Sequence, residues 1–259
     1  MKTTSAEWEK LLGEAERLLA QYVAATAGLT HASKGIRRSE LFFFYALVEP
    51  WRPLRIVESG RARAQSTLVL AHLFPSIPVV SLESDAKSPD AAVAAERLRD
   101  FRNVDCRFGD SLILLPQIVQ SGDVVLIDGP KDFRALKLAF HLLGTGKPAA
   151  VFVHDLWLGS PARRFVDRHL PFALLSDESH WVERYAALDS SKQAAPAPAG
   201  ARRAYGATMG CFDAGADDYS RRLAQCRVAQ AGDRLRATAR KLFRRPAPVR
   251  PKDFEVVSP

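Results

Sequence analysis

Residues 56–67 read Ile-Val-Glu-Ser-Gly-Arg-Ala-Arg-Ala-Gln-Ser-Thr, a short apolar run that ends in a carboxylate and passes into a turn of small residues. Gly60 permits the backbone to bend and to approach a ligand, and Ala62 and Ala64 keep the turn narrow. Ser66 is placed to cap the helix that follows. The stretch therefore predicts a strand, a tight turn and a helix start, which together form a nucleotide-type cradle.

Two well-known phosphate-binding patterns are absent from this turn. The dinucleotide pattern GxGxxG would need glycines where Ala62 and Gln65 stand. The pattern GxxxxGK[ST] is missing as well. A bound pyrophosphate is therefore disfavoured.

Downstream of the turn, short apolar runs alternate with stretches of helical spacing. The runs expected to be strands are 54–57, 79–82, 104–108, 124–127 and 150–153, and the expected helices are 66–73, 91–101, 112–119 and 133–143. This alternation is typical of a doubly wound parallel sheet. A further helix at 162–169 and strands at 172–176 and 207–212 would complete a mostly parallel, seven-stranded, Rossmann-like α/β fold, the last pair as a hairpin-like edge.

Helices are expected at both ends of the chain. Residues 5–26 have the spacing of an amphipathic helix, and a second helix is expected from its N-cap Ser39 to Pro50. Residues 216–243 indicate a basic helix, whereas 190–200 and 246–259 have the composition of a mobile excursion and a disordered end. We expect a helical cap at 1–53, a ligand-binding domain at 54–214 and a basic helix with a tail at 215–259.

Composition places the chain among ordinary globular proteins, with 47% hydrophobic and 25% charged residues in 259. No apolar run approaches the roughly 20 residues of a membrane span. The start of the chain lacks the features of a secretory signal, so we expect a cytoplasmic location. The three cysteines are scattered and are expected to be reduced thiols.

Positive charge is concentrated near the C-terminus. Residues 202–252 hold thirteen Lys or Arg against four Asp, a net +9 against +8 for the whole chain. Such a segment suits an acidic membrane surface, which would make the protein membrane-peripheral, or an acidic partner. A solvated tail stays open, and nucleic acid is disfavoured because no RNA-binding motif is present.

Polar residues follow each of the first three expected strands. Glu58 suits a ligand with a cationic amino group, although a structural role is equally open. Glu83, followed by Ser84, can accept two hydrogen bonds from a ribose diol. Asp110 and Ser111 are available for an adenine edge or, alternatively, for capping the next helix.

The fourth and fifth strands deliver a denser group. Asp128 and Lys131 follow one strand, and His154 and Asp155 follow the other. Parallel strands bring these side chains to one edge of the sheet, where ligands of doubly wound folds bind. Packing alone explains such a cluster poorly. Two structural interpretations stay open: His154 as a core histidine, and Lys131 in an ion pair with Asp132 or Asp155.

Two motifs make a resemblance specific. Glu58-Ser-Gly60-x-x-x-Ala64-x-Ser66 is similar to the cofactor turn of catechol- and caffeoyl-coenzyme A-type O-methyltransferases, which belong to the class I S-adenosylmethionine-dependent methyltransferases. Asp128-x-x-Lys131-Asp132 resembles their active-site motif, and the span to His154-Asp155 resembles a related group with a DGxH motif. The resemblance covers about residues 54–156 and implies S-adenosylmethionine as cofactor. The cofactor-binding residues expected are Glu58, Gly60, Ala62, Ser66, Glu83, Ser84, Asp110, Ser111 and Asp128.

The same resemblance implies a catalytic set of Lys131, Asp128 and His154. Asp128 and Asp155 would hold Mg²⁺, but Leu156 stands where the family has an Asn, so an oxygen ligand is lost. Lys131 or His154 would remove the acceptor proton, and Lys131 would need a lowered pKa to do so near neutral pH.

The expected reaction is methylation of a hydroxyl on a small molecule or saccharide. Two other functions stay open: an inactive binding protein of the same fold and a nucleic-acid-directed enzyme. A homodimer is also possible.

Overall fold

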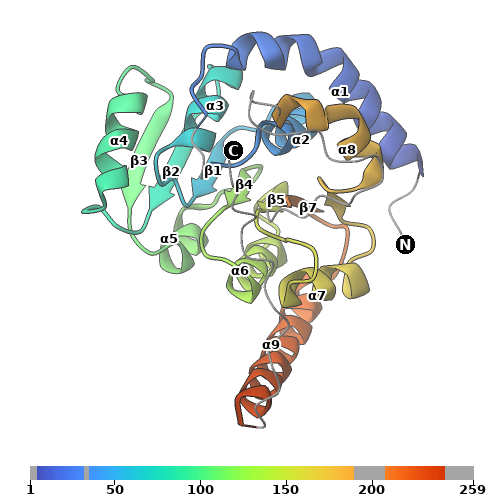
Figure 1. Cartoon of the computed structure of the whole chain (residues 1–259). Helices are drawn as coiled ribbons and strands as arrows, with labels where there is room; N and C mark the ends of the chain where they lie inside the picture. Colours follow the sequence, from blue (N-terminus) through green and yellow to red (C-terminus); the bar gives the residue numbers. More distant parts are fainter. Residues whose placement is uncertain (1–4, 32–34, 190–207, 243–259) are drawn as a thin grey trace, which may run out of the picture.

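The computed structural model describes residues 5–31, 35–189 and 208–242. They form one seven-stranded sheet in the order β3-β2-β1-β4-β5-β7-β6, with helices on both faces (Figure 1). The strands are β1 (Ile56–Ser59), β2 (Val79–Glu83), β3 (Val104–Phe108), β4 (Val124–Ile127), β5 (Ala150–Val153), β6 (Leu174–Leu175) and β7 (Gly210–Asp213).

The first five strands are parallel, and β7 runs antiparallel to both β5 and β6. The chain builds outward from β1 to β3, then returns to the other side of β1 with β4. This reversal is the point at which doubly wound sheets bind ligands, beyond the carboxyl ends of the strands. The predicted doubly wound, mostly parallel fold is confirmed.

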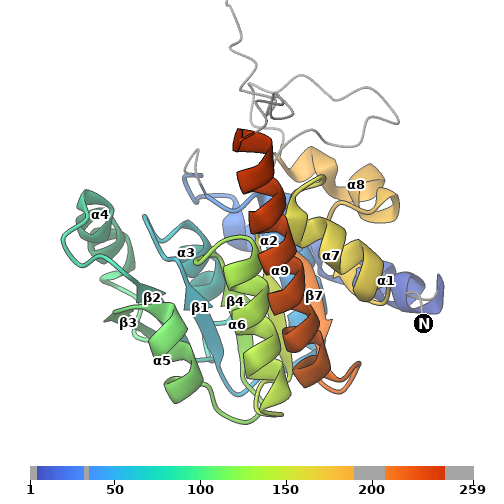
Figure 2. The same ribbon diagram turned by 90° about the horizontal axis from the view of Figure 1, so that it is seen from below.

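Alternate residues of the buried strands point into two cores, one on each face of the sheet. One face is covered by α1 (Ser5–Thr26), α2 (Arg38–Val48), α3 (Gln65–Leu73), α4 (Pro89–Leu98) and α8 (Ser179–Tyr185). The other is covered by α5 (Ser111–Ile118), α6 (Phe133–Gly144), α7 (Pro161–His169) and α9 (Tyr219–Leu242), as Figure 2 shows. Short 3-10 turns, Glu49–Trp51 and Ala186–Asp189, follow α2 and α8.

The N-terminal helices share a core with the sheet. Leu18 of α1 and Phe44 of α2 are fully buried in the cluster that contains Ile56 and Phe152 of the sheet. The ring of Phe44 lies 4.5 Å from the ring of Phe152, between centroids. Helix α2 is thereby fixed against β5, whose end carries part of the site.

Two predicted helix caps are wrong. Helix α2 has Arg37 as its N-cap, and Ser39 lies inside it with both its N–H and its hydroxyl bonded to Asp189. Helix α3 has Ala64 as its N-cap, with φ of 58°, so Ser66 also lies inside its helix. Each hydroxyl has a tertiary partner, which the local sequence pattern does not contain.

Several other expectations fall on residues outside the described ranges. These are the mobile excursion at 190–200, the first residue of the strand predicted at 207–212, and the disordered end at 246–259. All three cysteines are described and free, with Cys106 exposed and the other two buried. Within the described ranges, no helix combines the length and the apolar character that crossing a membrane requires. The division into 1–53, 54–214 and 215–259 stays a prediction.

Candidate functional site

The turns after β1 and β4 touch at the reversal point of the sheet. A Cβ added to Gly60, whose φ is +89°, would lie 2.7 Å from the backbone nitrogen of Gly129. The N–H groups of Asp128 and Gly129 both donate to the carbonyl of Ser59, at 2.9 and 3.1 Å. Only glycine fits at residue 60, because a side chain would push the two turns apart.

A cavity of about 190 Å³ lies beside these touching turns. Its lining comes from the ends of β1 to β4 and from the first turn of α6: Gly60, Leu82, Glu83, Ser84, Gly109, Asp110, Ser111, Gly129, Pro130 and Arg134. Five residues predicted to bind the cofactor, namely Gly60, Glu83, Ser84, Asp110 and Ser111, are thus brought together. The other five lining residues come from outside the predicted set: Leu82, Gly109, Gly129, Pro130 and Arg134.

Glu83 lines this cavity and is hydrogen-bonded to the backbone of the turn after β1 and of the loop after β2. Its Oε2 accepts a hydrogen bond of 2.8 Å from the backbone N–H of Ala62, and its Oε1 accepts one of 2.7 Å from that of Ser84. The side chain is only half-buried. Oε1 also accepts from the hydroxyl of Ser84 at 3.1 Å and from the N–H of Asp85 at 3.4 Å, so Oε2 is the oxygen with a lone pair left for a ligand.

Asp110 has the capping role that was left open as an alternative, whereas Ser111 is the first residue inside α5. Asp110 caps α5, its Oδ1 accepting from the N–H of Leu112 at 2.9 Å. The hydroxyl of Ser111 donates to the carbonyl of Gly129 at 3.1 Å. Both residues still line the cavity, so capping and ligand contact are compatible here.

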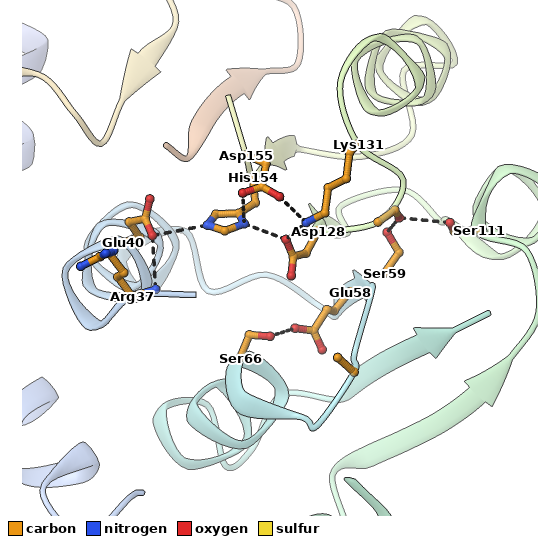
Figure 3. Close-up of polar contacts among 12 residues, drawn as sticks. Arg37, Glu40, Glu58, Ser59, Ser66, Ser111, Asp128, Lys131, His154 and Asp155 are labelled. Carbon is orange, nitrogen blue, oxygen red and sulfur yellow. Dashed lines mark hydrogen bonds and ion pairs between the residues drawn. The ribbon is translucent and has the colours of Figure 1, made fainter. Parts of the chain in front are cut away.

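Glu58 does not line the cavity. Its side chain is fully buried between β2 and α3, where the hydroxyls of Ser66, Thr67 and Ser81 donate to its carboxylate. Figure 3 shows the contact with Ser66. Burial raises the pKa of Glu58 above its usual value, although the three hydroxyls oppose that shift. Ser66 and Ala62 also lie outside the cavity lining, and Glu58 instead anchors the start of α3 behind the turn.

A second cluster lies past the ends of β4 and β5. Figure 3 shows the side chains of Asp128, Lys131, His154 and Asp155 converging there. Lys131 Nζ lies 2.6 Å from Asp128 Oδ1 and 2.6 Å from Asp155 Oδ2. The cluster brings the predicted catalytic and metal-binding residues together.

His154 is buried at the back of this cluster. Its Nδ1 lies 2.7 Å from Asp128 Oδ1, and its Nε2 lies 3.3 Å from Glu40 Oε2. Burial opposes the charge, but Glu40 and Asp128 outweigh it and raise the pKa of His154 to about 10. The raised pKa favours the imidazolium form of His154 at this position.

Glu40 was missed by the sequence reasoning. It occupies the first turn of α2, where its carboxylate accepts from the N–H of Arg37 at 3.2 Å. An acidic residue in a first helical turn is ordinary, because it suits the helix dipole. Nothing in the local pattern shows that α2 docks beside the loop after β5.

The charges of the cluster are mutually stabilising. Burial raises the pKa of Asp128, but His154 and Lys131 outweigh it, and the net effect is a lowered pKa. Burial lowers the pKa of Lys131, but Asp128 and Asp155 outweigh it, and the net effect is a raised pKa. A general base at Lys131 would need the opposite shift, so in this arrangement Lys131 is an ammonium ion.

Three residues of the cluster could also hold a metal ion. Asp128, His154 and Asp155 each offer one ligand atom, and these atoms lie within 4.8 Å of one another. The Lys131 ammonium, however, already bridges the two carboxylates, and the next residue, Leu156, is buried in an apolar core. Mg²⁺ prefers about six oxygens, so the donor set does not fit it well.

No family model matches the sequence, and no curated protein matches it. Solved structures with similar folds include an O-methyltransferase from Streptomyces achromogenes involved in tomaymycin synthesis, in complex with SAM. It is 18% identical, with 76% of this chain and 89% of that chain covered and a TM-score of 0.45.

Two further solved structures are an O-methyltransferase from Bacillus cereus with SAH and a methyltransferase from Podospora anserina with SAH. The first is 20% identical over 78% of this chain and 90% of that one, with a TM-score of 0.44. The second is 13% identical over 82% of this chain and 97% of that one, with a TM-score of 0.46. At these identities the likeness says nothing about individual residues of the site.

Proposed function

We propose that the chain is an S-adenosylmethionine-dependent methyltransferase that acts on a hydroxyl group of a small molecule or saccharide. One observation carries the proposal. A cavity lined by Glu83 lies at the reversal point of the sheet, next to a cluster of charged side chains. The position suits a nucleoside, and the neighbouring charges suit a proton transfer.

The residues around the cavity fit S-adenosylmethionine. The carboxylate of Glu83 suits a ribose hydroxyl, because it is half-buried, is fixed by three backbone N–H groups and keeps a lone pair on Oε2. Asp110 and Ser111, after β3, would flank the adenine. Gly60 lets the turn approach the ligand without a side chain. When bound, the cofactor supplies a methyl group on a sulfonium.

Glu58 supports the turn in this proposal and does not touch the cofactor. It is tied to Ser66 and Thr67 of α3 and to Ser81 of β2, so it fixes the helix start that follows the turn. Asp128 belongs to the charged cluster, and its backbone touches Gly60, but it does not line the cavity.

The charged cluster would receive the acceptor hydroxyl. Asp155 and Lys131 are the accessible members, with 31% and 48% of their side chains exposed. Lys131 Nζ would donate a hydrogen bond to the acceptor oxygen and stabilise the negative charge that develops there. A carboxylate oxygen of Asp155 would take the proton, while Asp128 and His154 hold Lys131 in place. Methyl transfer is an in-line displacement, so such positioning is the main contribution of the protein.

The proposal assigns no step to a divalent cation, because the Lys131 ammonium lies between the two carboxylates that would bind one. Lys131 remains a proposed catalytic residue, acting as a cation, and Asp128 and His154 become residues that position it. Asp155 joins Lys131 as the proton acceptor.

The basic C-terminal segment adds a peripheral role to the proposal. Within the described residues, α9 carries Arg221, Arg222, Arg227, Arg234, Arg236, Arg240 and Lys241 against the single acid Asp233. Val228 and Leu235, seven residues apart on one helix face, are 74% and 72% exposed. Basic and apolar side chains on one exposed helix suit an acidic membrane surface.

Formation of S-adenosylhomocysteine tests the reaction. The protein would be incubated with S-adenosylmethionine and each member of a panel of catechols, other phenols and free saccharides. The proposal expects S-adenosylhomocysteine to form with at least one hydroxyl acceptor and to be lost in Lys131→Met. Cofactor binding without turnover on any acceptor would favour the inactive binding protein.

A further inference from the structure

Strand β3 ends the sheet, and its outer edge has no strand beside it among the residues that the structure describes. The strand lies at the outer side of the molecule in Figure 1, next to α4. Its residues after Val104 are exposed on both faces of the sheet, including 47% of Phe108. An exposed edge with unpaired backbone groups is a template for a further strand.

The backbone groups on that outer edge belong to alternate residues. The carbonyl of Asn103 accepts from Val79, and the N–H of Gly109 donates to Glu83, so both of these odd-numbered residues face β2. Backbone direction alternates along a strand, which leaves Val104, Cys106 and Phe108 with their N–H and C=O groups pointing outward. The N–H of Val104, however, donates to the carbonyl of Phe101 at 3.4 Å. Among the described residues, the three residues therefore present five backbone groups without a backbone partner.

The sequence of β3, Val-Asp-Cys-Arg-Phe, is complementary to itself when read antiparallel. Centring the pairing on Cys106 places Val104 opposite Phe108 and Asp105 opposite Arg107 of the other copy. The three outward-facing residues then form the hydrogen-bonded pairs. Asp105 and Arg107 form the other pairs, whose Cα atoms are closer, at about 4.5 Å.

The charged residues also favour the register centred on Cys106 over the registers centred on Asp105 or Arg107. Asp105 and Arg107 lie on the same strand face 2.7 Å apart between charged atoms, with 53% and 43% of their side chains exposed. Shifting the centre by one residue would set Asp105 against Asp105 or Arg107 against Arg107. Like charges directly opposite each other destabilise a strand pair, and opposite charges stabilise it.

We propose that the outer edge of β3 is the docking surface for a second copy of this chain, which pairs antiparallel about Cys106 and continues the sheet across a twofold axis. A symmetric dimer requires such a self-complementary patch. The contact is small, so the dimer should form in a concentration-dependent way. It lies next to the loop after β3, whose Asp110 and Ser111 line the cavity.

Charge exchange at the two pairing positions tests the proposal. The full chain would be examined by sedimentation velocity across a range of protein concentrations. Wild type is expected to dimerise, and Asp105→Arg is expected to weaken dimerisation by roughly tenfold or more because arginines then face each other. The double variant Asp105→Arg/Arg107→Asp restores opposite charges and should restore the dimer.

Cross-linking at Cys106 provides a second readout, which reports whether the two copies pair at this strand. Cys106 is the exposed cysteine, and Cys211 and Cys226 are buried, so a short bismaleimide should link two copies of the native chain at Cys106. Cys106→Ser should remove the linked species, and Asp105→Arg should reduce it. Wild type that stays monomeric and unlinked at high micromolar concentration would overturn the proposal, as would a double variant no better than Asp105→Arg.

Discussion

The carboxylate of Glu40 and the imidazole of His154 lie 3.3 Å apart, between Oε2 and Nε2. One belongs to the N-terminal helix α2 and the other to the loop after β5, 114 residues later. Both groups are buried, with only 4% and 7% of their side chains exposed. The N-terminal helices are thus electrostatically coupled to the cluster that contains Lys131.

This pairing predicts that stability falls as pH rises. The raised pKa of His154, from 6.5 to about 10, means that the folded state keeps a proton which the unfolded state has lost. The stabilisation is complete below pH 6.5 and is lost as pH rises through about 10, with a slope of about 1.4 kcal/mol per pH unit between these values. Denaturant unfolding of wild type and His154→Gln across this range would measure the difference.

Glu40→Gln provides the matched test of the cause. Glu40 is the largest influence that raises the pKa of His154, so this variant should retain the imidazole and narrow the pH range over which stability is lost. A difference between wild type and His154→Gln that stays constant with pH would show that His154 does not carry the charge.

Two glycine substitutions distinguish the cost of a left-handed backbone conformation from the cost of a steric clash between turns. Gly60 and Gly215 have φ of +89° and +82°, but a Cβ at Gly215 would meet no atom within 4 Å. Gly215→Ala should cost about 1–2 kcal/mol for its backbone conformation alone. Gly60→Ala should cost more and should also weaken S-adenosylmethionine binding, because its Cβ would displace the turn of Gly129. Equal losses of stability with unchanged cofactor affinity would contradict the close approach.

Lys131 should exclude divalent cations from the charged cluster. Mg²⁺ is expected to leave the melting temperature of the wild-type protein unchanged, because the ammonium already bridges Asp128 and Asp155. Lys131→Ala removes that ammonium and leaves two carboxylates facing each other. The melting temperature of this variant should therefore rise with Mg²⁺ concentration. Lys131→Arg is the control that retains the charge. A wild-type melting temperature that rises with Mg²⁺ and falls with a chelator would refute this assignment.

The parallel strands, and the polar residues at their carboxyl ends, could be predicted from the sequence. Runs such as 124–127 and 150–153 are fully buried strands, and their apolar residues gave the boundaries that the structure has. Helix α8 was not predicted, because its seven residues hold only two buried side chains, Trp181 and Tyr185. Short helices are stabilised by tertiary packing, which local spacing does not show.

The site was predictable where a residue's position at a strand end decides its role. Glu83 is the last residue of β2, Asp128 follows β4 directly, and Asp155 is the second residue after β5. All three lie at the sheet edge where the pattern expects them. Glu58 is the second-last residue of β1, but its side chain points into the core, where the hydroxyls of Ser66 and Thr67 donate to it. The direction of that side chain and the docking of Glu40 depend on long-range packing, so neither was available from spacing alone.

Calorimetric titration with S-adenosylmethionine tests the central claim most directly, using wild type, Glu83→Ala and Asp85→Ala. Asp85 is the control because it is an exposed acid on the same loop and does not line the cavity. The account predicts binding to wild type and Asp85→Ala, and roughly 10- to 100-fold weaker binding to Glu83→Ala, the range for losing hydrogen bonds to a charged group. No binding to wild type, or equal affinity in all three proteins, would contradict it.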